Sequence, residues 1–301
     1  MMSPPYPPYV PAPQPALDPT RPLTASGAVL TLVVAFVACQ ITAAIALAAA
    51  MVGLGVFGLV DLNTLREADA AKKLLSHPVM LVAATGATGL TLVGTAFVAA
   101  KIGKRRFWDM IAVRKPKWFH VPLAIGMVLG AGPFADLAVR GMRTLFPSFT
   151  LHTLETIGEA AQGTAESAVV LTIVIAVIPG IGEEIFFRGM LQRSFVARLG
   201  APAGVALASV LFGAFHLDPP QAAGAAVLGG ALGFVSIRTG TIVPAMVAHA
   251  FNNALAMVAV RFSEPDTAPT EESAPVPLLV FGAVLMTGCV FGLLRTTQKP
   301  A

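Results

Sequence analysis

Charged residues are scarce in this chain of 301 residues. They make up 12% of the sequence, against about 25% in soluble domains, and 55% of the residues are hydrophobic. The composition therefore excludes an ordinary soluble protein. The net charge of +4 comes from basic residues between apolar stretches. That pattern is typical of loops that set membrane topology, and we expect no nucleic-acid partner.

Cysteine is equally scarce. Cys39 and Cys289 lie in apolar stretches far apart, so they form no disulfide framework and are expected to be buried, inert thiols. The motif His-Glu-x-x-His is absent, which excludes the usual helical zinc site of metalloproteases. The chain does not open on a basic-then-apolar segment, so no cleavable signal peptide is expected. Residues 1–25 are instead rich in proline and predict a disordered cytoplasmic tail.

Long apolar stretches are plentiful and predict an all-α fold, a polytopic transmembrane helix bundle of about eight spans. The fifth stretch is short, because Pro202 opens it and Asp218-Pro219-Pro220 ends it. We divide the chain into the tail, N-terminal transmembrane helices at 26–165, a helical core at 166–261, and a loop with the last helix at 262–301. The expected spans are 27–60, 78–100, 119–139, 167–198, 202–217, 221–237, 241–261 and 276–295.

Basic residues are concentrated between the second and third spans, which the positive-inside rule places in the cytoplasm. Alternation then puts both termini in the cytoplasm and the acidic 262–275 connection outside, in a multi-pass protein of the cell membrane. The long 140–166 connection has mixed charge and could be a surface helix or a lid. The basic residues are Lys101, Lys104, Arg105, Arg106, Arg114, Lys115 and Lys117.

Two adjacent carboxylates and an arginine interrupt the fourth span. An ionisable group at the bilayer centre costs at least about 2.5–3.5 kcal/mol, so such a cluster points to a function. Glu184 and Arg188 are i,i+4 neighbours on a helix and can form an ion pair. Glu183 points about 100° away from Glu184, because successive helical residues advance by that angle. Glu183 is therefore free to face another group.

Three further polar residues lie within apolar spans: His216, His249 and Asn253. Measured from a predicted turn near Gly200, Glu183 and His216 both lie about 25 Å along antiparallel helices. His249 and Asn253 are i,i+4 and share one helix face, about 14–20 Å from the preceding turn. We expect these four groups to reach one cavity that opens to the cytoplasm.

These residue types suit a hydrolase without a serine or cysteine nucleophile. A carboxylate can act as general base for water, and a facing histidine can hold the same water. A second histidine and an amide can donate to the oxyanion that forms when a carbonyl is attacked. Glu183, His216 and His249 are also the residue types of a catalytic zinc site. The residues alone leave both schemes open, one with no cofactor and one with a divalent metal such as zinc.

Three motifs lie on separate spans in the order Glu183-Glu184-x-x-x-Arg188, Phe212-x-x-x-His216 and His249-x-x-x-Asn253. They resemble the motifs of the CPBP family. That family comprises the type II CAAX prenyl endopeptidases and the bacteriocin-processing, Abi-like relatives, which are intramembrane proteases. The resemblance covers about 167–261, and the helical plan extends it loosely over most of the chain.

The resemblance implies a role for each polar residue. Glu183 corresponds to the water-activating glutamate and His216 to its partner, while His249 and Asn253 correspond to the oxyanion-stabilising pair. Glu184 and its ion-pair partner correspond to a buried structural pair, in which Glu184 also assists catalysis. The family has been described both as metalloproteases and as glutamate-dependent proteases, so the resemblance leaves the metal open.

The sequence thus predicts an intramembrane endopeptidase that uses a glutamate-activated water. Its partners would be the lipid bilayer and a membrane-associated or hydrophobic peptide or protein substrate. The alternative is a non-catalytic membrane protein that uses the same buried Glu/His cluster, either a proton-coupled carrier or an immunity or scaffold protein. The sequence shows no internal repeat, which disfavours the carrier. Structural roles also fit single residues: His216 could bond a backbone carbonyl at a helix end, and Asn253 could link two helices.

Overall fold

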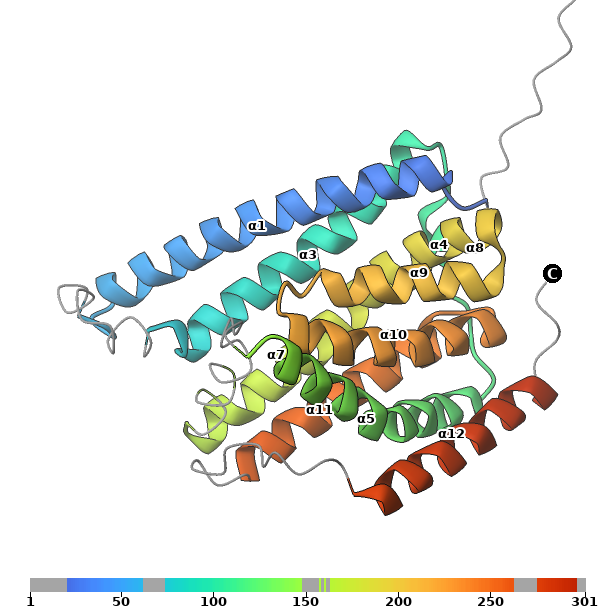
Figure 1. Ribbon diagram of the computed structural model, residues 1–301. Helices are drawn as coiled ribbons and strands as arrows, with labels where there is room; N and C mark the ends of the chain where they lie inside the picture. The colour runs from blue at the N-terminus through green and yellow to red at the C-terminus, as the bar shows by residue number, and fades with distance from the viewer. Residues whose placement is uncertain are drawn as a thin grey trace, which may run out of the picture.

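The computed structural model describes residues 21–61, 74–147, 157, 160, 163–262 and 275–296. Within these ranges every regular element is a helix, so the predicted all-α class is confirmed (Figure 1). Three predicted features lie partly or wholly outside the described residues. They are the proline-rich tail up to residue 20, the acidic part of the 262–275 connection, and much of the 140–166 connection.

Seven helices in the described ranges are long and apolar enough to cross a membrane. The fourth is a continuous segment, Glu166–Leu199, that begins as an α-helix, widens to a π-helix and returns to an α-helix. The protein is therefore a polytopic helical membrane protein. The crossing elements are α1 (Ala25–Val56), α3 (Pro78–Ile102), α5 (His120–Leu145), the series α7 (Ala165–Glu183), η2 (Glu184–Gln192) and α8 (Arg193–Leu199), α10 (Pro219–Thr239), α11 (Val243–Phe262) and α12 (Val276–Thr296).

The predicted fifth span is wrong. It forms α9 (Ala201–Ala214), whose 14 residues make about 21 Å of helix, less than the roughly 30 Å of a bilayer core. Gly200, at φ +80°, ends α8 and separates it from α9. Leu217, at φ +60°, lies in the turn that connects α9 to α10. Asp218 then caps α10 by accepting a hydrogen bond from the Gln221 amide. The alternation that placed both termini in the cytoplasm counted α9 as a crossing, so the sidedness of the termini stays a prediction.

Glycine allows α7 to approach two neighbouring helices closely. A Cβ on Gly182 would lie 3.1 Å from the Cα of Gly89 on α3. A Cβ on Gly180 would lie 2.9 Å from the backbone nitrogen of Ala250 on α11. Small residues at such crossings are the usual means of packing helices in lipid, where helix association gains little from the hydrophobic effect. Gly182 directly precedes Glu183, and Gly180 lies two residues earlier. The segment that leads into the carboxylates is therefore held against α3 at Gly182 and against α11 at Gly180.

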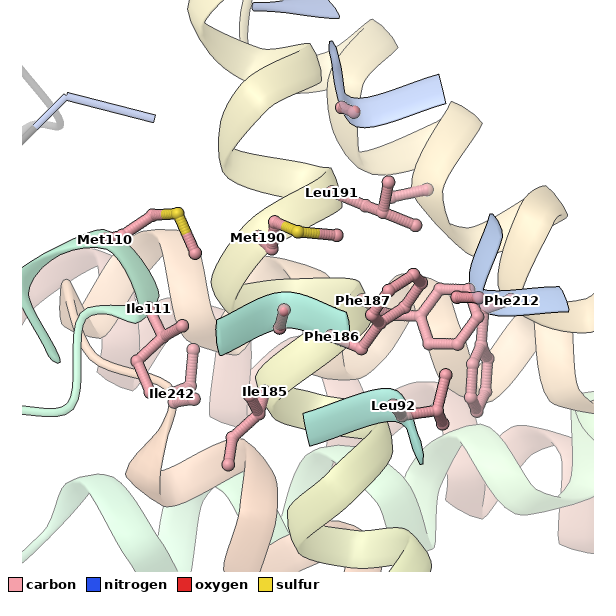
Figure 2. Packing of buried hydrophobic residues seen from close by; sticks show 14 of the residues in the cluster. Leu92, Met110, Ile111, Ile185, Phe186, Phe187, Met190, Leu191, Phe212 and Ile242 are labelled. Carbon is pink, nitrogen blue, oxygen red and sulfur yellow. The ribbon is translucent and has the colours of Figure 1, made fainter. Parts of the chain in front are cut away.

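An apolar cluster surrounds η2 and excludes water from it. Figure 2 shows Phe186 and Phe187 of η2 beside Phe212 of α9 and Leu92 of α3. All four side chains are at most 2% exposed. The Phe187 and Phe212 rings meet edge to face, with centroids 5.1 Å apart. The charged residues of η2 therefore lie in a dry environment.

The basic connection between α3 and α5 also contacts η2. It contains the short helix α4 (Phe107–Ile111), and Ile111 packs where a Cβ on Gly189 would lie. Arg193 donates hydrogen bonds to the carbonyls of Asp109 and Met110. This connection thus covers the end of η2 that the positive-inside rule assigns to the cytoplasm, and an opening of the site on that side stays a prediction. The division of the chain into four regions stays a prediction as well.

We expect Gly180→Ala to lower the free energy of unfolding by about 1–3 kcal/mol, the usual cost of overpacking. The new methyl group would press on the backbone of Ala250, so α7 and α11 must move apart. The matched control is Gly86→Ala on α3, where an added Cβ meets nothing within 4 Å. Thermal unfolding of the purified protein in detergent measures both. Equal melting temperatures for the two variants would contradict the close crossing.

Candidate active site

Glu184 is fully buried and holds two partners with a single oxygen atom. Its Oε1 accepts a hydrogen bond from Arg188 Nη1 at 2.7 Å and lies 2.9 Å from His249 Nδ1. A carboxylate oxygen only accepts, so Nδ1 of His249 carries the hydrogen of this bond. The side chains of Glu184 and Arg188 are 0% and 1% exposed. The ion pair expected from the i,i+4 spacing is thus present within η2, and the bond from His249 to the same oxygen links η2 to α11.

The Arg188 guanidinium also lies over an aromatic ring. Its Cζ is 4.2 Å from the centroid of Phe212, a distance at which the ring face attracts a cation. On α10, a Cβ at Gly229 would lie 3.3 Å from Arg188 Nη2 and 3.1 Å from the Phe212 ring. Among the described residues, Arg188 Nη2 and Glu184 Oε2 are buried without a hydrogen-bond partner. Glycine at 229 therefore makes room for the arginine between η2, α9 and α10.

Glu183 has different surroundings from its neighbour. Its side chain is 18% exposed, and its Oε2 lies 3.8 Å from His249 Nε2. The two ring nitrogens of His249 therefore face two different carboxylates, Nδ1 toward Glu184 and Nε2 toward Glu183. Of the two glutamates, Glu184 is enclosed by its partners, and Glu183 is the one that another molecule can reach.

His216 follows α9 and is half-buried. Its Nδ1 lies 3.0 Å from the Phe212 carbonyl and donates to it, because a carbonyl oxygen only accepts. Among the described residues, His216 forms no hydrogen bond with Glu183 or Glu184. Its link to the glutamates is the Phe212 ring, which meets the His216 ring at 5.1 Å and the His249 ring at 5.9 Å. The bond to a backbone carbonyl leaves Nε2 as the ring atom that can serve a substrate.

Asn253 lies one turn beyond His249 on α11, on the same face, and its amide is bonded to another helix. Its Nδ2 donates to the Ile175 carbonyl of α7 at 3.4 Å. Its Oδ1 lies 3.5 Å from Nδ2 of Asn252. The structure therefore brings Glu183, Glu184 and His249 together directly, while it places His216 and Asn253 at the margins of the same cluster.

The residues considered for zinc do not form a metal site in this arrangement. In the part of the chain that the structure describes, no three His, Cys, Asp or Glu residues lie close enough together to hold a metal ion. His249 uses Nδ1 for Glu184, and His216 does not contact Glu183. No step through a metal follows from this geometry.

Gln192, which was not among the residues predicted for the site, is 1% exposed at the end of η2. Its Nε2 donates to the Gly233 carbonyl at 3.0 Å and to Ser236 Oγ at 2.9 Å, so it fastens η2 to α10. A signal was available, because Gln192 continues the i,i+4 series of polar residues that begins with Glu184 and Arg188. The π-helix itself has no such signal, although π-helical turns are frequent at functional sites.

Fold and site together define a class of protein: a polytopic helical membrane protein with a carboxylate–histidine cluster inside the bundle. Residues 165–255 match the family described as Type II CAAX prenyl endopeptidase Rce1-like. The match spans all three motifs, confirms the predicted resemblance and supports membership of the chain in the CPBP family. This is a family of proteases. None of the curated proteins and none of the solved structures matches the chain.

We expect Arg188→Met to lower the free energy of unfolding by about 3–5 kcal/mol, because it leaves the Glu184 carboxylate buried without its cation. The control is Arg198→Met on the exposed side of α8, which should change stability by no more than about 0.5 kcal/mol. Adding Glu184→Gln to Arg188→Met should recover part of the loss, since the unpaired charge is removed. Melting temperatures in detergent provide the measurement. An Arg188→Met variant as stable as the control would refute the structural role of the pair.

Proposed function

We propose that this protein is an intramembrane endopeptidase that hydrolyses a peptide bond with a water activated by Glu183. The observation that carries the proposal is the unequal environment of two adjacent carboxylates. Glu184 is enclosed by Arg188 and His249, whereas Glu183 is partly exposed beside the second ring nitrogen of that histidine. The family match supports the reaction class, because the matched family is named for endopeptidases.

The geometry supports a water held between Glu183 and His249. Their facing atoms are 3.8 Å apart, too far for a direct hydrogen bond, and at such distances a bridging water is a common link. In the proposed reaction, Glu183 takes a proton from this water as its oxygen attacks the peptide carbonyl carbon. The proton then passes to the amide nitrogen, the C–N bond breaks, and the products are a carboxylic acid and an amine.

Three other residues of the cluster have separate roles in the proposed reaction. His249, already beside Glu183, is supported as the second partner of the water, a role that the motif resemblance assigned to His216. His216 is proposed to reach the substrate carbonyl or the leaving nitrogen with Nε2, from the turn between α9 and α10. Arg188 holds Glu184 and takes no part in bond making or breaking.

The surroundings of the site favour a hydrophobic substrate. The cluster lies within helices that are apolar enough to cross a membrane, so the scissile bond must enter a largely apolar space. A membrane-anchored or hydrophobic peptide can do so without losing a large hydration shell. A prenylated substrate is proposed from the name of the matched family alone.

We expect Glu183→Gln to reduce cleavage of a fluorogenic hydrophobic or prenylated peptide by about 10²–10⁴-fold, because the amide cannot accept the proton. Its melting temperature should match that of the native protein, since Glu183 is not part of the buried Glu184–Arg188 pair. The control is Glu166→Gln, an exposed carboxylate in the first turn of α7, which should leave cleavage unchanged. Cleavage retained by Glu183→Gln would overturn the mechanism.

The same assay with and without a strong chelator separates the two schemes of water activation. Activity that needs Glu183 and survives chelation supports a glutamate-activated water. Activity that chelation removes and zinc restores assigns Glu183 and the histidines to a metal. Absence of cleavage by a folded protein would favour the non-catalytic alternative, and a pH-dependent flux in proteoliposomes that Glu183→Gln abolishes would identify a carrier.

The melting temperature and kcat of a His216 variant distinguish a structural role of this residue from a catalytic one. If Nε2 serves the substrate, His216→Ala should lower kcat by about 10²-fold or more, the usual share of a positioned acid–base group. Its melting temperature should fall only slightly, because one hydrogen bond at a helix end is lost. Measuring both on the same preparation decides the role. A lower melting temperature with native kcat would leave His216 a purely structural residue.

A further inference from the structure

Pro179 interrupts the backbone hydrogen bonds of α7 one turn before the glutamates. In an α-helix the N–H of residue 179 would donate to the carbonyl of residue 175. Proline has no N–H, so the carbonyl of Ile175 loses its helical donor. An unpaired backbone carbonyl is costly in an apolar span, where water is absent and the chain itself must supply a donor.

Asn253 supplies that donor. Its Nδ2, on α11, is the group that lies 3.4 Å from the Ile175 oxygen. The opposite orientation of the amide would set Oδ1 against the carbonyl oxygen, two acceptors face to face, so the geometry selects the amino group. Nδ2 of Asn252, 3.5 Å from Oδ1 of Asn253, favours the same orientation.

This bond is one of three successive contacts between the same two helical segments. Ile175 meets Asn253 through the bond, Gly180 meets the backbone of Ala250, and Glu184 meets His249 at 2.9 Å. The two helical segments are antiparallel, so residues further along α7 and η2 contact residues nearer the start of α11. The first contact therefore helps to set the last, which positions His249 between the two carboxylates.

We propose that Pro179 is a positioning residue: by freeing the Ile175 carbonyl it engages the amide of Asn253, which docks α11 onto α7 and sets His249 against the glutamates. Asn253 then acts through His249, by way of its bond to the backbone of α7. The part of this inference that concerns turnover rests on the proposed function, whereas the docking of the helices does not.

A double-mutant cycle with Pro179→Ala and Asn253→Ala tests the proposal. In the native background, Asn253→Ala should lower the melting temperature and reduce kcat roughly 10- to 100-fold through misplacement of His249, with little change in KM. In the Pro179→Ala background the new N–H satisfies Ile175. There Asn253→Ala should lower the melting temperature little further, because the Ile175 carbonyl no longer needs the amide of Asn253.

Two more variants make the cycle robust. Asn253→Asp keeps the shape of the side chain, but an ionised carboxylate cannot donate, so it should behave like Asn253→Ala. Pro179→Gly supplies the same backbone N–H as Pro179→Ala and replaces it if that protein cannot be purified. The matched control is Asn252→Ala, which leaves the donor to Ile175 in place and should have the smaller effect on the melting temperature.

The outcomes are distinct. If Asn253 donates only to an oxyanion, Asn253→Ala should lower kcat by about 10²–10³-fold in both backgrounds with little change in melting temperature, and the proposal is overturned. Equal losses of melting temperature in both backgrounds would overturn it too. Because the thermal measurement needs no substrate, non-additive melting temperatures in a protein without peptidase activity would uphold the docking and reject only the proposed hydrolysis.

Discussion

The burial of the Glu184 carboxylate is the constraint on which the rest of this structure depends. A charge in an apolar interior persists only when opposite charges and hydrogen-bond donors surround it. Arg188 comes from the same helix, but His249 must come from α11, so satisfying Glu184 also fixes α11 against η2. The position of Glu183 follows from that of Glu184. Adjacent residues of a helix point in different directions, so the Glu183 carboxylate lies on the more open side.

The support for this cluster extends beyond the segment that matches the family. Leu92 and Gly89 on α3, and Ile111 on α4, pack against η2 or the helix that leads into it, and all three precede residue 165. In lipid, helices gain little from burying apolar surface against each other, so close van der Waals packing and hydrogen bonds between helices must hold them. The glycine contacts and the bond from Asn253 to Ile175 are interactions of this kind.

Much of the helical architecture could be predicted from apolar length. The stretch predicted at 78–100 is α3, Pro78–Ile102, and the stretch predicted at 276–295 is α12, Val276–Thr296. The exception was α9, where the apolar run continues to Leu217 but the helix stops at Ala214. Hydropathy reports that a segment is apolar, but where a helix ends and how much of the bilayer it crosses also depend on backbone turns and on neighbouring helices.

The sequence by itself determined what helical periodicity dictates: the Glu184–Arg188 pair, the shared face of His249 and Asn253, and the separation of Glu183 from Glu184. Distances within one helix are set by its regular geometry, so they can be read from spacing alone. Only the tertiary structure decided that His249 bonds Glu184 and that Asn253 bonds the carbonyl freed by Pro179. Those choices depend on which helix faces meet, and a buried polar group takes whichever partner the packing of distant segments brings within reach.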